Sequence, residues 1–140
     1  MVLEEVFPVE AGAYATAGEA STAIKRKLKQ LGVDSGVLRR VSVASYEVEL
    51  NLVIHSMGGT LTLKVDPEKV TLISRDVGPG IPDIDKAMTE GYSTANEEAR
   101  SLGFGAGMGL PNMRRNATTF EIQSQVGVGT SIVMSFALAA

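Results

Sequence analysis

The sequence predicts an α+β protein, a two-layer α/β sandwich in which helices cover one face of a mixed, mostly antiparallel sheet. Three observations predict this class: a long stretch of helical periodicity early in the chain, a pair of alternating apolar segments in the middle, and a second such pair at the end. Strands joined by short turns pair antiparallel, and grouped helices then cover one face of their sheet. A chain of 140 residues with 44% apolar content suffices for one core. We therefore expect residues 1–140 to form a single domain.

The first half of the chain predicts one strand followed by two helices, at residues 3–9, 14–31 and 34–56. Pro8 lacks a backbone donor, so the first strand is expected at a sheet edge. Gly32 ends the first helix, because glycine readily takes the conformation that closes a helix. Asp34 or Ser35 caps the second helix with a side-chain oxygen.

The second half predicts four strands and two short helices, with the strands at 60–65, 70–76, 120–125 and 130–138 and the helices at 83–90 and 110–117. In the first of these strands Leu61, Leu63 and Val65 share one face, which identifies the side that meets the core. Residues 91–109 are polar and then glycine-rich, without periodicity.

Composition excludes several classes of function. The chain has no cysteine and one histidine, which excludes disulfides, thiolate metal sites and cysteine nucleophiles and argues against a histidine metal site. A net charge of -3 argues against direct binding of nucleic acid. No apolar run approaches the length of a membrane span and no secretory leader opens the chain, so we expect a cytoplasmic protein without membrane contact.

The second predicted helix carries polar residues inside its apolar arc. Glu47 and Asn51 lie one turn apart on that arc, with His55 one turn further along, whereas Glu49 is predicted to face solvent. A buried carboxylate needs a partner, because desolvating it costs several kcal/mol, roughly. A salt bridge or a bond to a loop would provide one. Alternatively the arc lines a ligand pocket, with Glu47 as a base and Asn51 as an oxygen ligand of Mg²⁺. His55 is interpreted as a core or rim residue.

Asp76 ends the strand at 70–76 and is followed by a sharp turn with Gly78 and Gly80. The carboxylate shares a strand face with apolar residues, where it can accept a hydrogen bond from an exocyclic amine such as that of adenine. Glycine at these positions admits positive φ angles or close approach of a ligand. A structural turn without a ligand explains the same residues equally well.

Four alternating glycines precede the helix at 110–117, in the segment 103–109. Backbone N–H groups at a helix N-terminus can bind phosphate, and glycines leave them accessible. No Gly-Lys-Ser/Thr follows and no strand immediately precedes, so this is neither a P-loop nor a dinucleotide fingerprint. The polar segment 91–102 before it is expected to act as a flap. A flexible linker is the alternative. Thr130, after the last glycine pair, is expected to place a hydroxyl near Asp76.

Together these segments resemble the GHKL superfamily of ATPases and kinases. Residues 47–51 match its N box, residues 76–80 its first glycine box, 103–109 its second, and 127–130 its last motif. Within the superfamily the chain is most similar to the small bacterial anti-sigma factor and stressosome switch serine kinases. The resemblance implies a GHKL-like fold with ATP and Mg²⁺ as cofactors.

The resemblance also implies a role for each matching residue. Glu47 would be the catalytic base and Asn51 the Mg²⁺ ligand, while Asp76 would read adenine with help from Thr130 through water. The remaining residues implied to contact the nucleotide are Gly78, Gly80, Ile81, Ser93, Thr94, Arg100, Gly103, Gly105, Gly107, Met108, Gly109 and Leu110.

The implied activity is that of an ATP-dependent serine/threonine protein kinase, with weak ATPase activity, that regulates by switching between partners. Its implied substrate is an STAS-domain anti-sigma antagonist, its further partners are a sigma factor or a downstream phosphatase, and a homodimer is compatible with this role. The alternative is an anti-sigma or docking module for which ATP is mainly a conformational ligand. A detached histidine kinase catalytic domain is a third hypothesis, and the absence of a phosphoacceptor helix argues against it.

Overall fold

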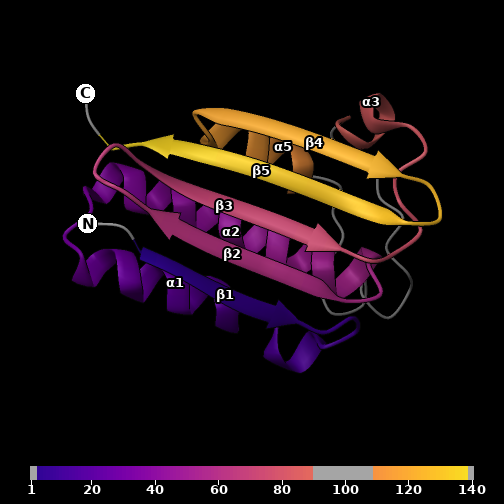
Figure 1. Ribbon diagram of the computed structural model, residues 1–140, viewed down its shortest axis with the longest axis horizontal. Coiled ribbons are helices and arrows are strands. Elements are labelled where there is room, and N and C mark those ends of the chain that lie inside the picture. Colours follow the sequence, from indigo (N-terminus) through magenta and orange to yellow (C-terminus); the bar gives the residue numbers. More distant parts are fainter. Residues whose placement is uncertain (1–2, 90–108, 139–140) are drawn as a thin grey trace.

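Five strands form one sheet in the computed structural model, which describes residues 3–89 and 109–138. The sheet order is β1-β2-β3-β5-β4, and each described pair of neighbours is antiparallel (Figure 1). The strands are β1 (Leu3–Val9), β2 (Gly59–Val65), β3 (Lys69–Asp76), β4 (Thr119–Gln125) and β5 (Gly129–Ala137). The predicted α+β class is confirmed, and β1 lies at a sheet edge as Pro8 predicts.

Helices cover one face of this sheet, with α2 in the middle (Figure 1). After a 3-10 turn, η1 (Tyr14–Thr16), the described helices are α1 (Glu19–Gln30), α2 (Ser35–His55), α3 (Ile84–Ala87) and α5 (Gly109–Asn116). Because α1 packs on one flank of α2 and α5 on the other, α2 is covered from three sides. Within residues 3–89 and 109–138, none of the helices is long and apolar enough to cross a membrane.

The helix predicted at 14–31 is divided in two. Gly18 takes a φ of +103° and separates η1 from α1, which begins at Glu19. The second helix begins as predicted, since the Asp34 side chain accepts a hydrogen bond from the Gly36 N–H at 3.0 Å. Gly32, with a φ of +76°, follows the end of α1 as expected for a helix-ending glycine.

The core lies between α2 and the covered face of the sheet. The predicted alternation of β2 is confirmed, because Leu61, Leu63 and Val65 are all buried. The register sets Leu63 opposite Leu72, and Leu72 opposite Met134, so the apolar faces of three strands are continuous. Each fully buried side chain of this size contributes about 1.5–3 kcal/mol to the free energy of unfolding. This packing fixes α2, which carries the polar pair singled out in the sequence.

Candidate functional site

Glu47 and Asn51 point toward the first residue of α5. A Cβ atom added to Gly109 would lie 3.2 Å from Glu47 Oε2 and 3.4 Å from Asn51 Oδ1. The two oxygens therefore converge on one point, one turn apart along α2. Glycine at position 109 leaves that point open, since the methyl group of alanine would crowd both oxygens.

The environment of Glu47 is half-buried and polar. Burial raises the pKa of the Glu47 carboxyl above its ordinary value, and a hydrogen bond from Asn112 lowers it. The Asn112 amide donates from Nδ2 to Glu47 Oε1 at 3.5 Å. A carboxyl with a raised pKa binds a proton more readily near neutral pH, which is what a general base requires. Further along α2, burial lowers the pKa of the His55 imidazole and favours its neutral form.

Asp76 lies half-buried at the end of β3. Its Oδ1 accepts a hydrogen bond from the Thr130 backbone N–H at 2.9 Å. Burial raises the pKa of Asp76, and the Thr130 bond lowers it. The Thr130 hydroxyl, which the sequence predicts near Asp76, pairs with Ser124 Oγ at 2.9 Å. Thr130 therefore fixes the carboxylate through its backbone, while its hydroxyl contacts Ser124, its cross-strand partner on β4.

The glycine turn after Asp76 is fastened to the β4–β5 hairpin. The Gly78 N–H donates to the Val128 carbonyl at 3.1 Å, and the Ile81 N–H donates to Ser124 Oγ at 2.7 Å. Gly80 has a φ of +75°, and a Cβ there would lie 2.5 Å from the Gln125 carbonyl oxygen. Only glycine meets both conditions at position 80. Hydrogen bonds and close packing therefore hold the turn against the β4–β5 hairpin, so that it forms a fixed wall beside Asp76.

The two parts of the site lie along the C-terminal half of α2. A Cβ at Gly78 would lie 3.3 Å from Ser56 Cα and 3.6 Å from Asp76 Oδ1, so Asp76 lies close to the end of α2. Glu47 precedes Ser56 by nine positions, which corresponds to about 13 Å at the rise of an α-helix. The polar groups therefore form an elongated row that suits an elongated ligand.

Several residues of the predicted site lie outside the described ranges: Ser93, Thr94, Arg100, Gly103, Gly105, Gly107 and Met108. The structure therefore tests neither the glycine-rich phosphate contact nor the flap, except at Gly109 and Leu110. The Leu110 side chain is buried in the core, which leaves its backbone for any contact with a ligand.

Glu49 contradicts the prediction of a solvent-facing carboxylate. Its side chain is 3% exposed and accepts hydrogen bonds from the backbone N–H groups of Gly18, Ala20 and Ser21, at 3.0, 3.1 and 2.9 Å. The prediction failed because helical periodicity identifies one apolar arc and assigns the remaining positions to solvent. In the structure α2 also packs against α1, which buries a second side of the helix. One signal was present in the sequence: Gly18 interrupts the helix predicted at 14–31, and glycine has no side chain to cap a helix that begins after it.

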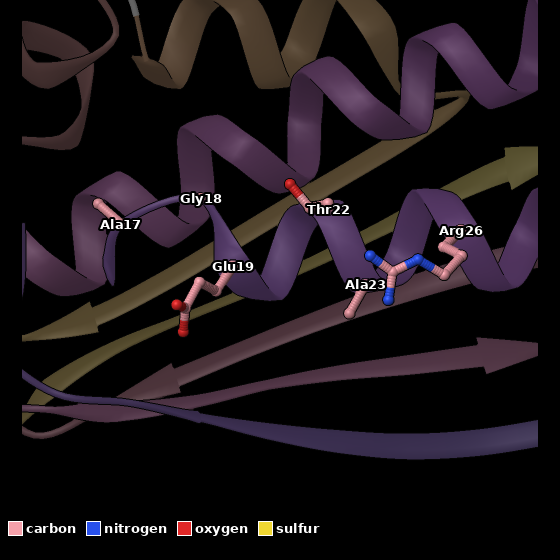
Figure 2. Close-up of a pocket in the computed structure, with 6 residues that line it drawn as sticks. All are labelled: Ala17, Gly18, Glu19, Thr22, Ala23 and Arg26. Atoms are coloured by element: carbon pink, nitrogen blue, oxygen red, sulfur yellow. The ribbon is translucent and has the colours of Figure 1, made fainter. Parts of the chain in front are cut away.

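A separate hollow of about 470 Å³ lies on α1 (Figure 2). It is lined only by residues of the segment 17–26 and shares none with the row on α2. Helix N-termini attract anions through their free N–H groups. Here the N–H groups of Gly18, Ala20 and Ser21 are bound to Glu49, which leaves little of the usual basis of an anion site.

Comparison with known proteins gives consistent matches. Residues 37–140 match the family described as histidine kinase-, DNA gyrase B-, and HSP90-like ATPase. The chain is 32% identical over 108 residues to the serine/threonine-protein kinase RsbT of Bacillus subtilis, covering 74% of this chain and 75% of that protein. It is 31% identical over 121 residues to the anti-sigma F factor of Thermoanaerobacter sp., covering 83% and 81%. The anti-sigma F factor of Clostridium acetobutylicum is 32% identical over 99 residues, covering 67% and 66%.

Proposed function

The chain belongs to the histidine kinase-, DNA gyrase B- and HSP90-like ATPase family, and from this premise we propose that it is an ATP-dependent serine/threonine protein kinase acting as a partner-switching regulator. Relatives with more than 30% identity are named as a serine/threonine kinase and as anti-sigma factors. The observation that carries the proposal is the convergence of Glu47 and Asn51 on Gly109, where a carboxylate and an amide oxygen meet an open point.

The donor set of the site suits Mg²⁺ together with ATP. Magnesium prefers oxygen ligands and is usually held by one or two protein groups, with substrate phosphates and water completing its shell. Asn51 Oδ1 is such a group. Among the residues that the structure describes, no cluster of three or more His, Cys, Asp or Glu side chains is placed to hold a metal by itself. We therefore propose that Asn51 holds the cation jointly with phosphate oxygens.

The proposed chemistry transfers a phosphoryl group to a hydroxyl of a protein partner. When bound, ATP with Mg²⁺ supplies an activated γ-phosphoryl group. Glu47 in its carboxylate form would orient the serine or threonine hydroxyl and accept its proton as the new oxygen–phosphorus bond forms, while the bond from the γ-phosphorus to the β–γ bridging oxygen breaks and ADP leaves. The half-buried setting of Glu47 supports this role, because its raised pKa lets the carboxylate retain the proton.

At the other end of the row we propose that Asp76 recognises adenine. A carboxylate accepts several hydrogen bonds, so the bond from Thr130 leaves capacity for the exocyclic amine. Gly78 and Gly80 form the adjacent wall, and their attachment to the β4–β5 hairpin keeps that wall in place.

We propose an STAS-domain anti-sigma antagonist as the substrate in the cytoplasm, with a sigma factor or a downstream phosphatase as further partner. The second candidate function is an anti-sigma docking module in which ATP acts mainly as a conformational ligand. It is favoured by the names of the anti-sigma relatives. The convergent, half-buried Glu47 favours the kinase, since a docking module has no need of a base.

Radiolabelled ATP and purified candidate STAS proteins separate the two functions. We expect label transfer by the native chain and none by Glu47→Gln, which keeps the size of the side chain but cannot accept the proton. Nucleotide affinity of the variant should stay within about threefold, because the change removes charge but little contact. Glu121→Gln on the exposed surface of β4 serves as the matched control. Transfer by Glu47→Gln at the native rate would exclude Glu47 as the base, and stable complexes without transfer would favour the docking module.

A further inference from the structure

The side chain of Asn112 links α5 to Glu47, and the sequence did not mark it as functional. Asn112 lies three positions after Gly109 and on the same side of α5, so both face α2. Its Nδ2 donates to Glu47 Oε1 at 3.5 Å, and its Oδ1 accepts from Arg115 Nη1 at 3.1 Å. A guanidinium group only donates hydrogen bonds. The arginine therefore fixes which end of the amide faces the carboxylate.

We propose that Asn112 is a positioning residue for Glu47, with its amide oriented by Arg115. This inference rests on the proposed role of Glu47 as the base. It adds an atomic assignment: Oε1 is held by the Asn112 amide, which leaves Oε2, the oxygen nearest Gly109, to accept the proton of the attacking hydroxyl.

The geometry gives this contact a physical consequence. Donation from Asn112 stabilises the charged form of the carboxylate and favours the orientation in which Oε1 faces Asn112 and Oε2 faces Gly109. Among the described residues, the neutral amides of Asn51 and Asn112 face Glu47, and the Asn112 amide in turn accepts a hydrogen bond from Arg115. Burial raises the pKa of Glu47 while the Asn112 bond lowers it.

The contact also makes the base sensitive to the position of α5. A separation of 3.5 Å is at the long end for a hydrogen bond, so a shift of a few tenths of an ångström, roughly, tightens or breaks it. The helix begins at Gly109, the last of the four alternating glycines of the sequence. A displacement of α5 toward α2 is therefore expected to strengthen the hold on Oε1.

The first test measures Glu47 directly in the full chain without nucleotide. The side-chain carboxyl signal of Glu47, identified by its loss in Glu47→Gln, is followed by NMR between pH 3 and 9, roughly. We expect Asn112→Ala to raise the pKa of Glu47, and Asn112→Asp to raise it further by adding like charge. Asn116→Ala is the matched control, because Asn116 donates to the Asn112 backbone carbonyl instead of to Glu47. An unchanged Glu47 titration in Asn112→Ala would overturn the proposal.

The second test separates positioning from a general loss of structure. With ATP as the only substrate, turnover of Asn112→Ala should fall about tenfold, because a misdirected base loses alignment. Its pH midpoint should move upward together with the Glu47 titration, while ATP affinity stays within about twofold. If Glu47→Gln itself retains native turnover, the base role fails. The titration then still decides whether Asn112 holds the carboxylate, so the two failures are distinguishable.

Discussion

The attachment of α1 to α2 through Glu49 allows a quantitative prediction. The Glu49 carboxylate accepts three backbone N–H bonds of 2.9–3.1 Å, and two of the donors, in Ala20 and Ser21, are buried. Hydrogen bonds to a charged group contribute about 1.5–3 kcal/mol each, and a buried donor left without a partner costs about 1–3 kcal/mol. Water can replace the bond at the half-exposed Gly18 but reaches the other two less easily. We therefore expect Glu49→Ala to lower the free energy of unfolding by about 4 kcal/mol.

Such a loss is large against the total stability of a typical domain, about 5–15 kcal/mol. Urea unfolding followed by circular dichroism measures it, and amide hydrogen exchange should show faster exchange at Ala20 and Ser21. Glu49→Gln keeps the shape and one acceptor, so its loss should be about half as large. The matched control is Glu47→Ala, two positions earlier on the same helix. A loss below about 1 kcal/mol in Glu49→Ala would refute the assignment of Glu49 as the cap of α1.

Three further predictions concern the row along α2 and its glycine wall. Because the pKa of Glu47 is raised in the folded state, the native chain binds this proton more tightly than the unfolded chain, and stability falls as pH rises from the ordinary carboxyl pKa through the raised one. Glu47→Gln should remove that decline in stability and raise Tm at pH 7. The prediction is contradicted if Tm of the variant follows that of the native chain between about pH 4 and 8. Gly80→Ala should lower the free energy of unfolding, measured in urea, by about 3 kcal/mol, because the position has a positive φ and the new Cβ would lie 2.5 Å from a carbonyl oxygen. Gly127→Ala, at a φ of +79° with nothing within 4 Å of the new Cβ, should lower it by only about 1 kcal/mol. Asp76→Asn keeps an acceptor for the Thr130 N–H but adds a donor, so calorimetry should show ATP binding weakened by about tenfold, and undiminished affinity would exclude the adenine role.

Local periodicity accounts for what could be predicted of the fold. The alternation of Leu61, Leu63 and Val65 identified the buried face of β2, and Pro8 identified an edge strand. Both signals depend on neighbouring residues alone. The convergence of Glu47 and Asn51 was also predictable, because residues four apart on a helix share a face.

Contacts between distant segments account for what could not be predicted. Glu49 caps a helix that begins about 30 positions earlier, and Asn112 meets Glu47 across a separation of 65. Thr130 holds Asp76 by its backbone N–H, which depends on the register of β5 beside β3 and β4. No local pattern records such pairings.

The sequence by itself determined the class of the fold, the motifs that place the chain in its family, and the face of α2 that carries Glu47 and Asn51. The tertiary structure alone decided that Glu49 is a buried, structural carboxylate and does not face solvent. Glu47 and Glu49 are the same residue type two positions apart, and a different helix packs against each: α5 brings an open glycine and an amide to Glu47, while α1 brings three N–H groups to Glu49.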